Sequence, residues 1–280
     1  MATDRPLVQD TPLVWIPLRS GERLAARLWL PEGWEKASLP AIVEYIPYRR
    51  GDYTAVRDQA NHGYLAAHGY ACLRIDARGT GDSDGIHHEQ WSDDYDRDAL
   101  DAFAWIRAQP WSDGGIAMIG LSWGGNSALR MASLAPAELK AVIAISASDD
   151  RYTNKFAGGC LLLNSVVWSY TMTAQNSRPP DPVSVGEAWR QAWLDRLAKA
   201  PWYIEQWLAH QRRDDYWASG SVVERYGAFG CPVYIVGGQA DPGYLATVPA
   251  LLAGLSVPSK GLIGPWAHKK PWEAMPGPAV

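Results

Sequence analysis

Short apolar runs alternate along the chain with longer segments in which apolar and charged residues recur every three or four positions. The short runs predict buried strands and the longer segments predict amphipathic helices. Residues 14–17 and 23–30 predict a hairpin, because turn-forming residues join them. Later strands are predicted at residues 41–46, 71–75, 116–119, 141–145, 233–236 and 261–263. Helices are predicted at residues 59–67, 93–108 and 125–134 and near 246–254. This alternation predicts an α/β fold with a mostly parallel sheet flanked by helices, made mixed by its antiparallel opening.

One long segment, residues 149–229, interrupts this rhythm between the sixth and seventh predicted strands. It is rich in tryptophan and in helix-forming residues, and Ser177-Arg178-Pro179-Pro180-Asp181-Pro182 breaks it in the middle. An insertion at this point predicts a helical cap over the carboxyl ends of the strands. The expected organisation is therefore a core of residues 1–148 and 230–280 with a cap of residues 149–229.

Composition narrows the class of protein. The 280 residues carry a net charge of −4 and no basic run, so nucleic acid and anionic membranes are not expected partners. No apolar leader opens the chain, and no apolar run approaches the length that spans a bilayer. Cys72, Cys160 and Cys231 are widely spaced in or near apolar sequence, which predicts buried reduced thiols. A cytoplasmic enzyme fits these properties best.

The strongest chemical signal is Gly120-Leu121-Ser122-Trp123-Gly124, which joins a predicted strand to a predicted helix. A serine between glycines at this junction is typical of a nucleophile elbow, a sharp turn that exposes the hydroxyl. Glycine is needed two positions before and after the serine because larger side chains would collide there. The alternative interpretation is an ordinary glycine-rich turn.

Ser122 needs a base and an acid if it is a nucleophile, and in this architecture both follow it in the order acid, then histidine. Asp241 lies just beyond the strand 233–236, and His268 lies just beyond the strand 261–263. The other histidines fit worse. His62 and His68 fall in or beside a predicted helix, His210 in the cap, and His87-His88 in a polar loop where solvation is expected rather than a metal. No metal or organic cofactor is predicted.

Four segments resemble the cocaine esterase / X-prolyl dipeptidyl-peptidase family of α/β-hydrolases, which includes α-amino-acid ester hydrolases. They are Pro47-Tyr48-Arg49, the run DARGTGDSDG at residues 76–85, Gly120-Leu121-Ser122-Trp123-Gly124-Gly125 and Gly264-Pro265-Trp266-Ala267-His268. The resemblance implies an α/β-hydrolase fold and an oxyanion hole formed by the Tyr48 hydroxyl and the Trp123 N–H. Without it, Tyr48 would be taken for a packing residue.

Two further charged segments favour structural roles. In residues 79–85, Asp84 replaces the third glycine of a dinucleotide-binding loop, so we expect an ion pair between Asp76 and Arg78 instead. Asp214 and Asp215 resemble cap acids that bind a substrate ammonium in part of the family. A salt bridge to Arg212 or Arg213, or a solvated helix end, is the favoured interpretation.

The predicted function is two-step hydrolysis of a small ester by Ser122, His268 and Asp241. The alternatives are an X-Pro dipeptidyl-peptidase acting on short peptides, an amino-acid ester or amide hydrolase, and a non-catalytic binding module. Family members usually continue into a C-terminal jelly-roll domain, whereas this sequence ends twelve positions after His268. We therefore expect a hydrolase-domain fragment, with self-association through the surface that the absent domain would cover.

Overall fold

The structure is a computed structural model that describes residues 7–273. The N-terminal residues considered above and the last seven residues lie outside that range. By internal contacts the chain divides into two compact units. The first unit comprises Met1–Ile116 and Trp168–Tyr203, and the second comprises Ala117–Val167 and Ile204–Val280. Each unit is described by itself.

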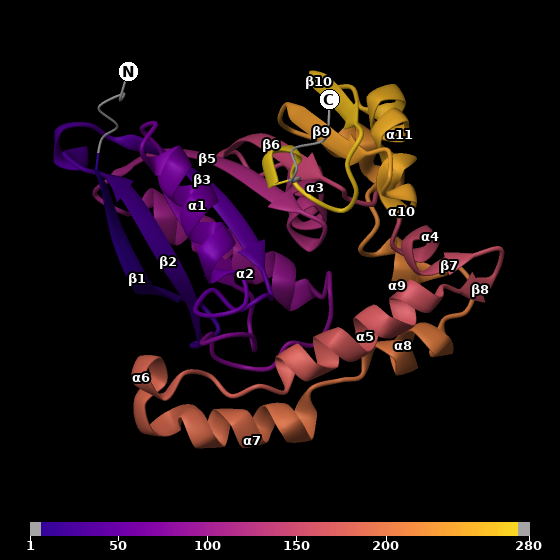
Figure 1. The fold of residues 1–280 in the computed structure, drawn as a ribbon, viewed down its shortest axis with the longest axis horizontal. Helices are drawn as coiled ribbons and strands as arrows, with labels where there is room; N and C mark the ends of the chain where they lie inside the picture. The colour runs from indigo at the N-terminus through magenta and orange to yellow at the C-terminus, as the bar shows by residue number, and fades with distance from the viewer. Residues whose placement is uncertain (1–6, 274–280) are drawn as a thin grey trace. The chain divides into compact units, whose positions relative to one another are not determined.

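The first unit contains the opening hairpin and a parallel strand pair (Figure 1). Its elements are β1 (Val8–Pro17), β2 (Arg23–Pro31), η1 (Trp34–Lys36), β3 (Leu39–Ile46), α1 (Ala55–Ala66), β4 (Ala71–Asp76) and α2 (Asp93–Arg107). The strands lie in the order β1-β2-β4-β3, antiparallel except for the parallel pair β3 and β4. Helix α1 packs on β2 and β4, and α2 packs on β1. Strand β4 is buried along its whole length, as expected of a strand covered on both faces.

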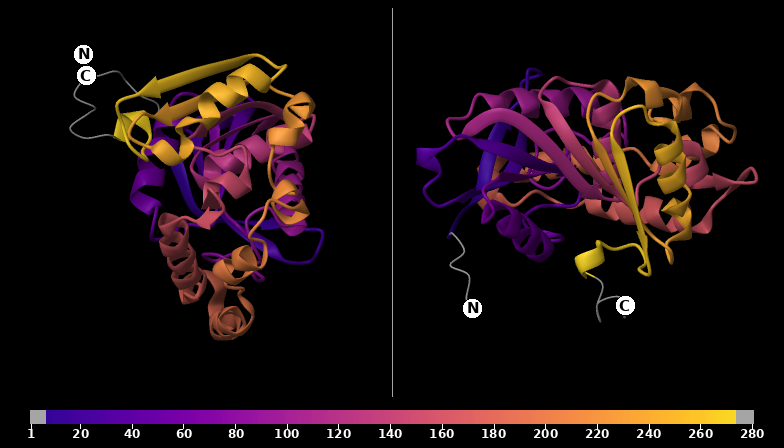
Figure 2. Two further views of the ribbon diagram at one scale, coloured as in Figure 1. Left: turned by 90° about the vertical axis from the view of Figure 1, so that its right-hand side faces the viewer. Right: turned by 90° about the horizontal axis from the view of Figure 1, so that it is seen from above.

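The second unit contains the later parallel strands. The boundary between the units falls within β5 (Ser112–Leu121), which is followed by α3 (Trp123–Leu134) and β6 (Leu139–Ile145). Further along are β9 (Val233–Gly238), α10 (Pro242–Leu245), α11 (Thr247–Gly254), β10 (Ser259–Gly264) and η4 (Pro271–Glu273). Strand β9 pairs in parallel with β6 on one side and β10 on the other, so their carboxyl ends meet at one edge. Helix α3 packs on β6, while α10 and α11 lie beside β9 and β10 (Figures 1 and 2).

The insertion between β6 and β9 is helical, as predicted. It contains α4 (Arg151–Lys155), α5 (Leu163–Asn176), α6 (Pro182–Val185), η2 (Gly186–Ala188), α7 (Trp189–Lys199), α8 (Tyr203–Ala209), α9 (Asp215–Ala218) and η3 (Val223–Ala228). The sequence did not indicate the short hairpin of β7 (Phe156–Ala157) and β8 (Cys160–Leu161). Residues 168–203 group with the first unit and the rest with the second, so a separate cap of residues 149–229 stays a prediction.

The cysteines are all free, but only two of them are buried. Cys72 and Cys231 lie in the core, and burial raises the pKa of the Cys231 thiol to about 11. Cys160 is exposed on β8, which corrects the expectation that all three are buried. A hairpin of two-residue strands buries little surface, so an apolar sequence there does not guarantee burial. No helix in residues 7–273 is long and apolar enough to cross a membrane.

A buried ionic network fixes the loop after β3 in the first unit. Arg74, fully buried on β4, pairs with Asp58 of α1 (3.1 Å) and with Asp76 (3.1 Å). Asp76 also accepts a hydrogen bond from the backbone N–H of Arg50 (2.8 Å), whose guanidinium pairs with Asp82 (2.7 Å). Burial raises the pKa of Asp76, although the two arginines act in the opposite direction. The network therefore ties β4 to the residues that follow Tyr48.

The expected pair between Asp76 and Arg78 does not form. Arg78 binds Asp98 of α2 (2.6 Å) and Glu22 (2.7 Å) instead. The two side chains leave the chain in different directions because Asp76 ends β4 inside the core, whereas Arg78 lies in the loop beyond it. Both residues are structural, but each has its own partners.

The network predicts a large cost for removing its central charge. Arg74→Met leaves two buried carboxylates without their shared partner, so we expect the free energy of unfolding to fall by about 3–5 kcal/mol. Arg97→Met is the control, since that side chain is 61% exposed and pairs with Asp94 at the surface. Its effect is expected to stay below about 1 kcal/mol. Denaturant unfolding of both variants checks the difference, and equal losses would contradict the role of the network.

Candidate active site

Ser122 occupies a strained turn between β5 and α3. Its backbone has φ 59° and ψ −115°, a conformation that non-glycine residues rarely adopt. The turn is held from both sides. The Ser122 N–H donates to the carbonyl of Ile145 at the end of β6 (2.8 Å), and the Ser122 carbonyl accepts from the N–H of Asn126 (2.9 Å). The hydroxyl is therefore presented at the carboxyl end of β5 by a rigid backbone.

Steric contacts explain why glycines flank Ser122. A Cβ on Gly120 would lie 2.3 Å from the backbone carbon of Gly124, so no other residue fits at position 120 without moving the turn. A Cβ on Gly125 would lie 3.0 Å from the Ala147 side chain and from the carbonyl of Ile145. The close approach of positions 120 and 124 is the collision anticipated from the sequence.

Asp241 and His268 are brought together by the loops after β9 and β10. The His268 Nδ1 lies 2.7 Å from the Asp241 Oδ2. Two backbone hydrogen bonds tie these loops, from the Gln239 N–H to the Gly264 carbonyl (2.8 Å) and from the Ala240 N–H to the Trp266 carbonyl (3.0 Å). Position 238 must be glycine because a Cβ there would lie 2.2 Å from the Trp266 carbonyl oxygen.

Trp266 anchors the histidine loop in the core of the second unit. Its ring packs with Ile145 and Val236, which lie at the ends of β6 and β9. Two residues further on, the His268 side chain is 41% exposed, whereas the Asp241 side chain is only 10% exposed. The imidazole is thus reachable by a small molecule, while the carboxylate that binds it is sheltered from water.

This arrangement defines a direction for proton transfer. In the tautomer whose Nδ1–H donates to the Asp241 carboxylate, Nε2 is the acceptor. Among the described residues of the second unit, no hydrogen bond joins His268 to Ser122. The pair and the serine turn lie at the same edge, since β6, β9 and β10 are in parallel register there.

The beginning of α3 supplies a second element of the site. Trp123 is the first residue of this helix and its side chain is buried. The first N–H groups of a helix find no acceptor inside the helix, and the helix dipole favours negative charge near them. The Trp123 N–H therefore suits a developing oxyanion on a group bonded to Ser122.

Tyr48 lies in the first unit, directly after β3 and Pro47. It is half-buried, and its ring packs edge-on against Tyr53 (6.3 Å between centroids). The next residue, Arg49, has φ 56° and binds Asp52 (3.0 Å), so the loop is strained and braced. Its role in an oxyanion hole stays a prediction.

Tyr244 is a residue that sequence reasoning did not single out. It lies on α10, three positions after Asp241, and its ring covers the imidazole of His268 at 4.9 Å with a tilt of 33°. Burial raises the pKa of the phenol, and hydrogen bonding with Asn154 and Ser122 only partly offsets that rise. The only available sequence signal was an aromatic residue one turn beyond the predicted acid.

The remaining histidines have structural surroundings. His87 is buried, not solvated as expected, and its Nδ1 lies 3.1 Å from the Arg78 carbonyl. Burial lowers the pKa of His87 to about 4, so the ring is neutral. The polar residues around His87 predicted exposure, but the loop folds back so that the ring contacts the Arg78 backbone and is buried. His88 lies at the surface against Asp94 (3.2 Å).

The acids of the insertion also have structural partners. Asp214 caps α9 by accepting a hydrogen bond from the Tyr216 N–H, and its carboxylate lies 2.6 Å from His210. Arg213 binds Asp150 and Glu224, so the first alternative, a salt bridge to Arg213, does not form, whereas the second, an exposed helix end, agrees with Asp214 as the N-cap of α9. The structural interpretation holds with a different partner, because the loop between α8 and α9 places His210 beside Asp214.

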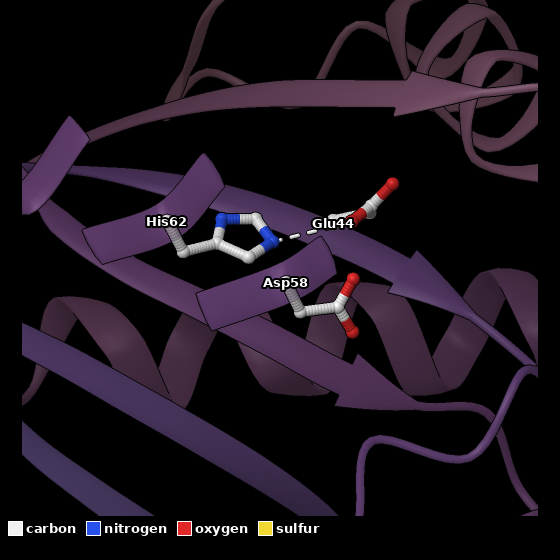
Figure 3. A group of neighbouring side chains, drawn as sticks. All are labelled: Glu44, Asp58 and His62. Carbon is white, nitrogen blue, oxygen red and sulfur yellow. Dashed lines mark hydrogen bonds and ion pairs between the residues drawn. The ribbon is translucent and has the colours of Figure 1, made fainter. Parts of the chain in front are cut away.

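One group of side chains in the first unit has the composition of a metal site. Glu44 of β3 and Asp58 and His62 of α1 bring oxygen and nitrogen atoms within 4.8 Å of one another (Figure 3). His62 Nε2 lies 3.2 Å from the Glu44 carboxylate. Arg57 and Arg74 bind Asp58 at 3.0 and 3.1 Å, and Arg57 also lies 3.7 Å from the Glu44 carboxylate, so both carboxylates already have cationic partners. We interpret the group as part of the buried ionic network.

A cavity of about 620 Å³ lies in the first unit next to the loop after Tyr48. Four of its charged lining groups pair with one another: Arg50 with Asp82, and Arg49 with Asp52. Asp76 and Asp181 are the other two, and Asp76 is paired with Arg74.

Solved structures identify the fold. A CocE/NonD family hydrolase from Staphylococcus aureus matches with a TM-score of 0.73 at 19% identity, over 94% of this chain and 47% of its own. An aminopeptidase from a Thaumarchaeota archaeon of marine sediment matches with a TM-score of 0.73 at 22% identity, over 96% and 50%. The chain has the α/β-hydrolase fold.

The family follows from the sequence itself. The chain belongs to the X-Pro dipeptidyl-peptidase (S15) family, whose model matches residues 20–270. Cocaine esterase from Rhodococcus sp. (strain MB1 Bresler) is 28% identical to it over 283 residues, which cover 91% of this chain and 48% of the esterase. The chain thus spans about half the length of this relative.

Proposed function

We propose that the chain is a serine hydrolase that cleaves carboxylic esters through Ser122, His268 and Asp241. The observation that carries the proposal is the pairing of His268 with Asp241 (2.7 Å) in the same unit as a serine held at φ 59°. A strained serine on a strand-to-helix turn is the arrangement that exposes a nucleophile in this fold. Membership of a hydrolase family supports the same chemistry.

The reaction has two steps. Ser122 Oγ attacks the ester carbonyl while His268 Nε2 takes its proton, and the protonated imidazole then donates that proton to the leaving alkoxide. Water next attacks the acyl-enzyme with His268 as base, which releases the acid and restores the serine. Asp241 keeps the imidazole in the required tautomer and stabilises its positive charge.

The negative charge that develops on the carbonyl oxygen needs donors. The Trp123 N–H at the start of α3 is one proposed donor, and the Tyr48 hydroxyl is the other. Tyr48 is assigned this role from its motif, Pro47-Tyr48-Arg49, and from its place after the third strand. No cofactor takes part in this scheme.

A second candidate function is cleavage of X-Pro peptides or amino-acid amides. The matching family model and the structural similarity to an aminopeptidase favour it. The same serine, histidine and acid would act, because both reactions pass through an acyl-enzyme. The third candidate is a binding module without catalysis, which the sheltered Asp241 beside His268, together with the strained Ser122, disfavours.

Replacing the proposed nucleophile tests the mechanism. We expect Ser122→Ala to abolish fluorophosphonate labelling and to lower ester turnover by roughly 10⁴-fold or more, with an unchanged circular dichroism spectrum. Ser219→Ala is the matched control, since that serine is exposed on the same unit. Wild-type turnover in the Ser122 variant would refute the mechanism, and a wild-type chain that neither labels nor turns over esters would favour the binding module.

The oxyanion donor is tested separately. Tyr48→Phe should reduce kcat by roughly 10²- to 10³-fold with little change in KM, because the hydrogen bond strengthens only as charge develops. Tyr53→Phe, which alters the exposed ring beside Tyr48, is the control. A kcat within about twofold of the wild type would return Tyr48 to a packing role.

A comparison of ester and amide substrates distinguishes the esterase from the peptidase. We expect short acyl esters to be hydrolysed with a higher kcat/KM than aminoacyl-proline amides, because an alkoxide departs more easily than an amine. Steady-state kinetics with both panels makes the comparison, and Ser122→Ala gives the background for each. Preferential cleavage of the aminoacyl-proline amides would select the peptidase instead.

A further inference from the structure

Tyr244 contacts the general base and lies beside the nucleophile of the proposed mechanism. Its ring lies against the His268 imidazole, with 4.9 Å between centroids, and its hydroxyl interacts with the side chains of Ser122 and Asn154. All four residues belong to the second unit. Any group bonded to Ser122 Oγ and within reach of His268 must therefore pass close to the Tyr244 hydroxyl.

The hydroxyl is held in place from behind. Asn154, on α4, accepts a hydrogen bond from the Lys155 ammonium through its Oδ1 (2.8 Å). With its oxygen occupied in this way, the amide presents its N–H groups as donors to the Tyr244 oxygen. The Ser122 hydrogen bond also lowers the Tyr244 pKa, as a donor to the phenol oxygen does, so the phenol has its own O–H left to donate.

The phenol keeps its proton under working conditions. Its burial raises the pKa of Tyr244 above the ordinary value near 10, so the group is neutral at pH 7. A neutral phenol donates a hydrogen bond but does not compete with His268 as a base. Tyr244 can thus stabilise an oxygen that gains negative charge without removing a proton from it.

We propose that Tyr244 is a further catalytic residue whose hydroxyl donates a hydrogen bond to the leaving-group oxygen of the ester. The inference rests on the proposed function of Ser122 and His268. During acylation the Oγ–carbon bond forms and the bond from carbon to the leaving oxygen breaks. The serine proton moves to His268 Nε2 and then to the leaving oxygen, which must lie near the imidazole that Tyr244 covers. Tyr244 keeps its own proton throughout.

The dependence of rate on the leaving group tests this role. Tyr244→Phe keeps the ring on His268 and removes only the hydroxyl. We expect kcat/KM for alkyl esters, whose alkoxides need stabilisation, to fall by about tenfold, and kcat/KM for nitrophenyl esters to stay within about twofold. The plot of log kcat/KM against leaving-group pKa should therefore become steeper. Asn154→Ala, which loosens the phenol, should change the slope in the same direction by less.

The controls distinguish the proposed role of Tyr244 from the proposed mechanism of Ser122 and His268. Tyr234→Phe, on the partly exposed surface of β9, should leave the slope unchanged. An equal loss for every ester, or no loss, in Tyr244→Phe would overturn the proposed role, because a purely structural residue does not distinguish leaving groups. If the wild type hydrolyses no ester through Ser122, the proposed function itself fails, and the Ser122→Ala comparison reports that outcome independently.

Discussion

The positive φ of Ser122 is the constraint on which the candidate site depends. A non-glycine residue keeps φ 59° only where its surroundings prevent relaxation, and such strain costs of the order of 1–3 kcal/mol. Here the bond to Ile145 and the close approach of Gly120 to Gly124 leave the backbone no room to move. Because the turn is fixed, the hydroxyl direction and the first N–H of α3 are fixed together.

In the first unit a strained loop is held by buried charges instead of by steric contact. The loop that carries Tyr48 also contains a strained residue, Arg49, and has no helix of its own to hold it. Its support is the buried network in which Asp76 of β4, paired with Arg74, accepts a hydrogen bond from the backbone N–H of Arg50. A buried charge without its partner is far costlier than a solvated one, so the network has effectively one stable arrangement.

The sequence predicted the elements that local pattern determines. Most strands and helices fell within about four residues of their observed bounds, although β1 begins at Val8, six residues before the predicted strand. The turn at Ser122 and the pairing of Asp241 with His268 followed from spacing and chain order. It failed where tertiary contacts decide. Arg78 forms its ion pair with Asp98, not with Asp76 as predicted, and His87 is buried although its loop is polar. Tyr244 could not be found because packing on His268 leaves no periodic signal.

A histidine bound to a carboxylate does not by itself define a catalytic site in this protein. His210 and Asp214 approach as closely as His268 and Asp241, at 2.6 and 2.7 Å. The Asp214 carboxylate is 46% exposed, so water also hydrates it. Its other oxygen accepts the hydrogen bond that caps α9. Asp241 is sheltered, and its histidine is covered by Tyr244 at the edge where β9 and β10 end. The local environment of each pair, rather than its geometry, separates a structural pair from one suited to proton transfer.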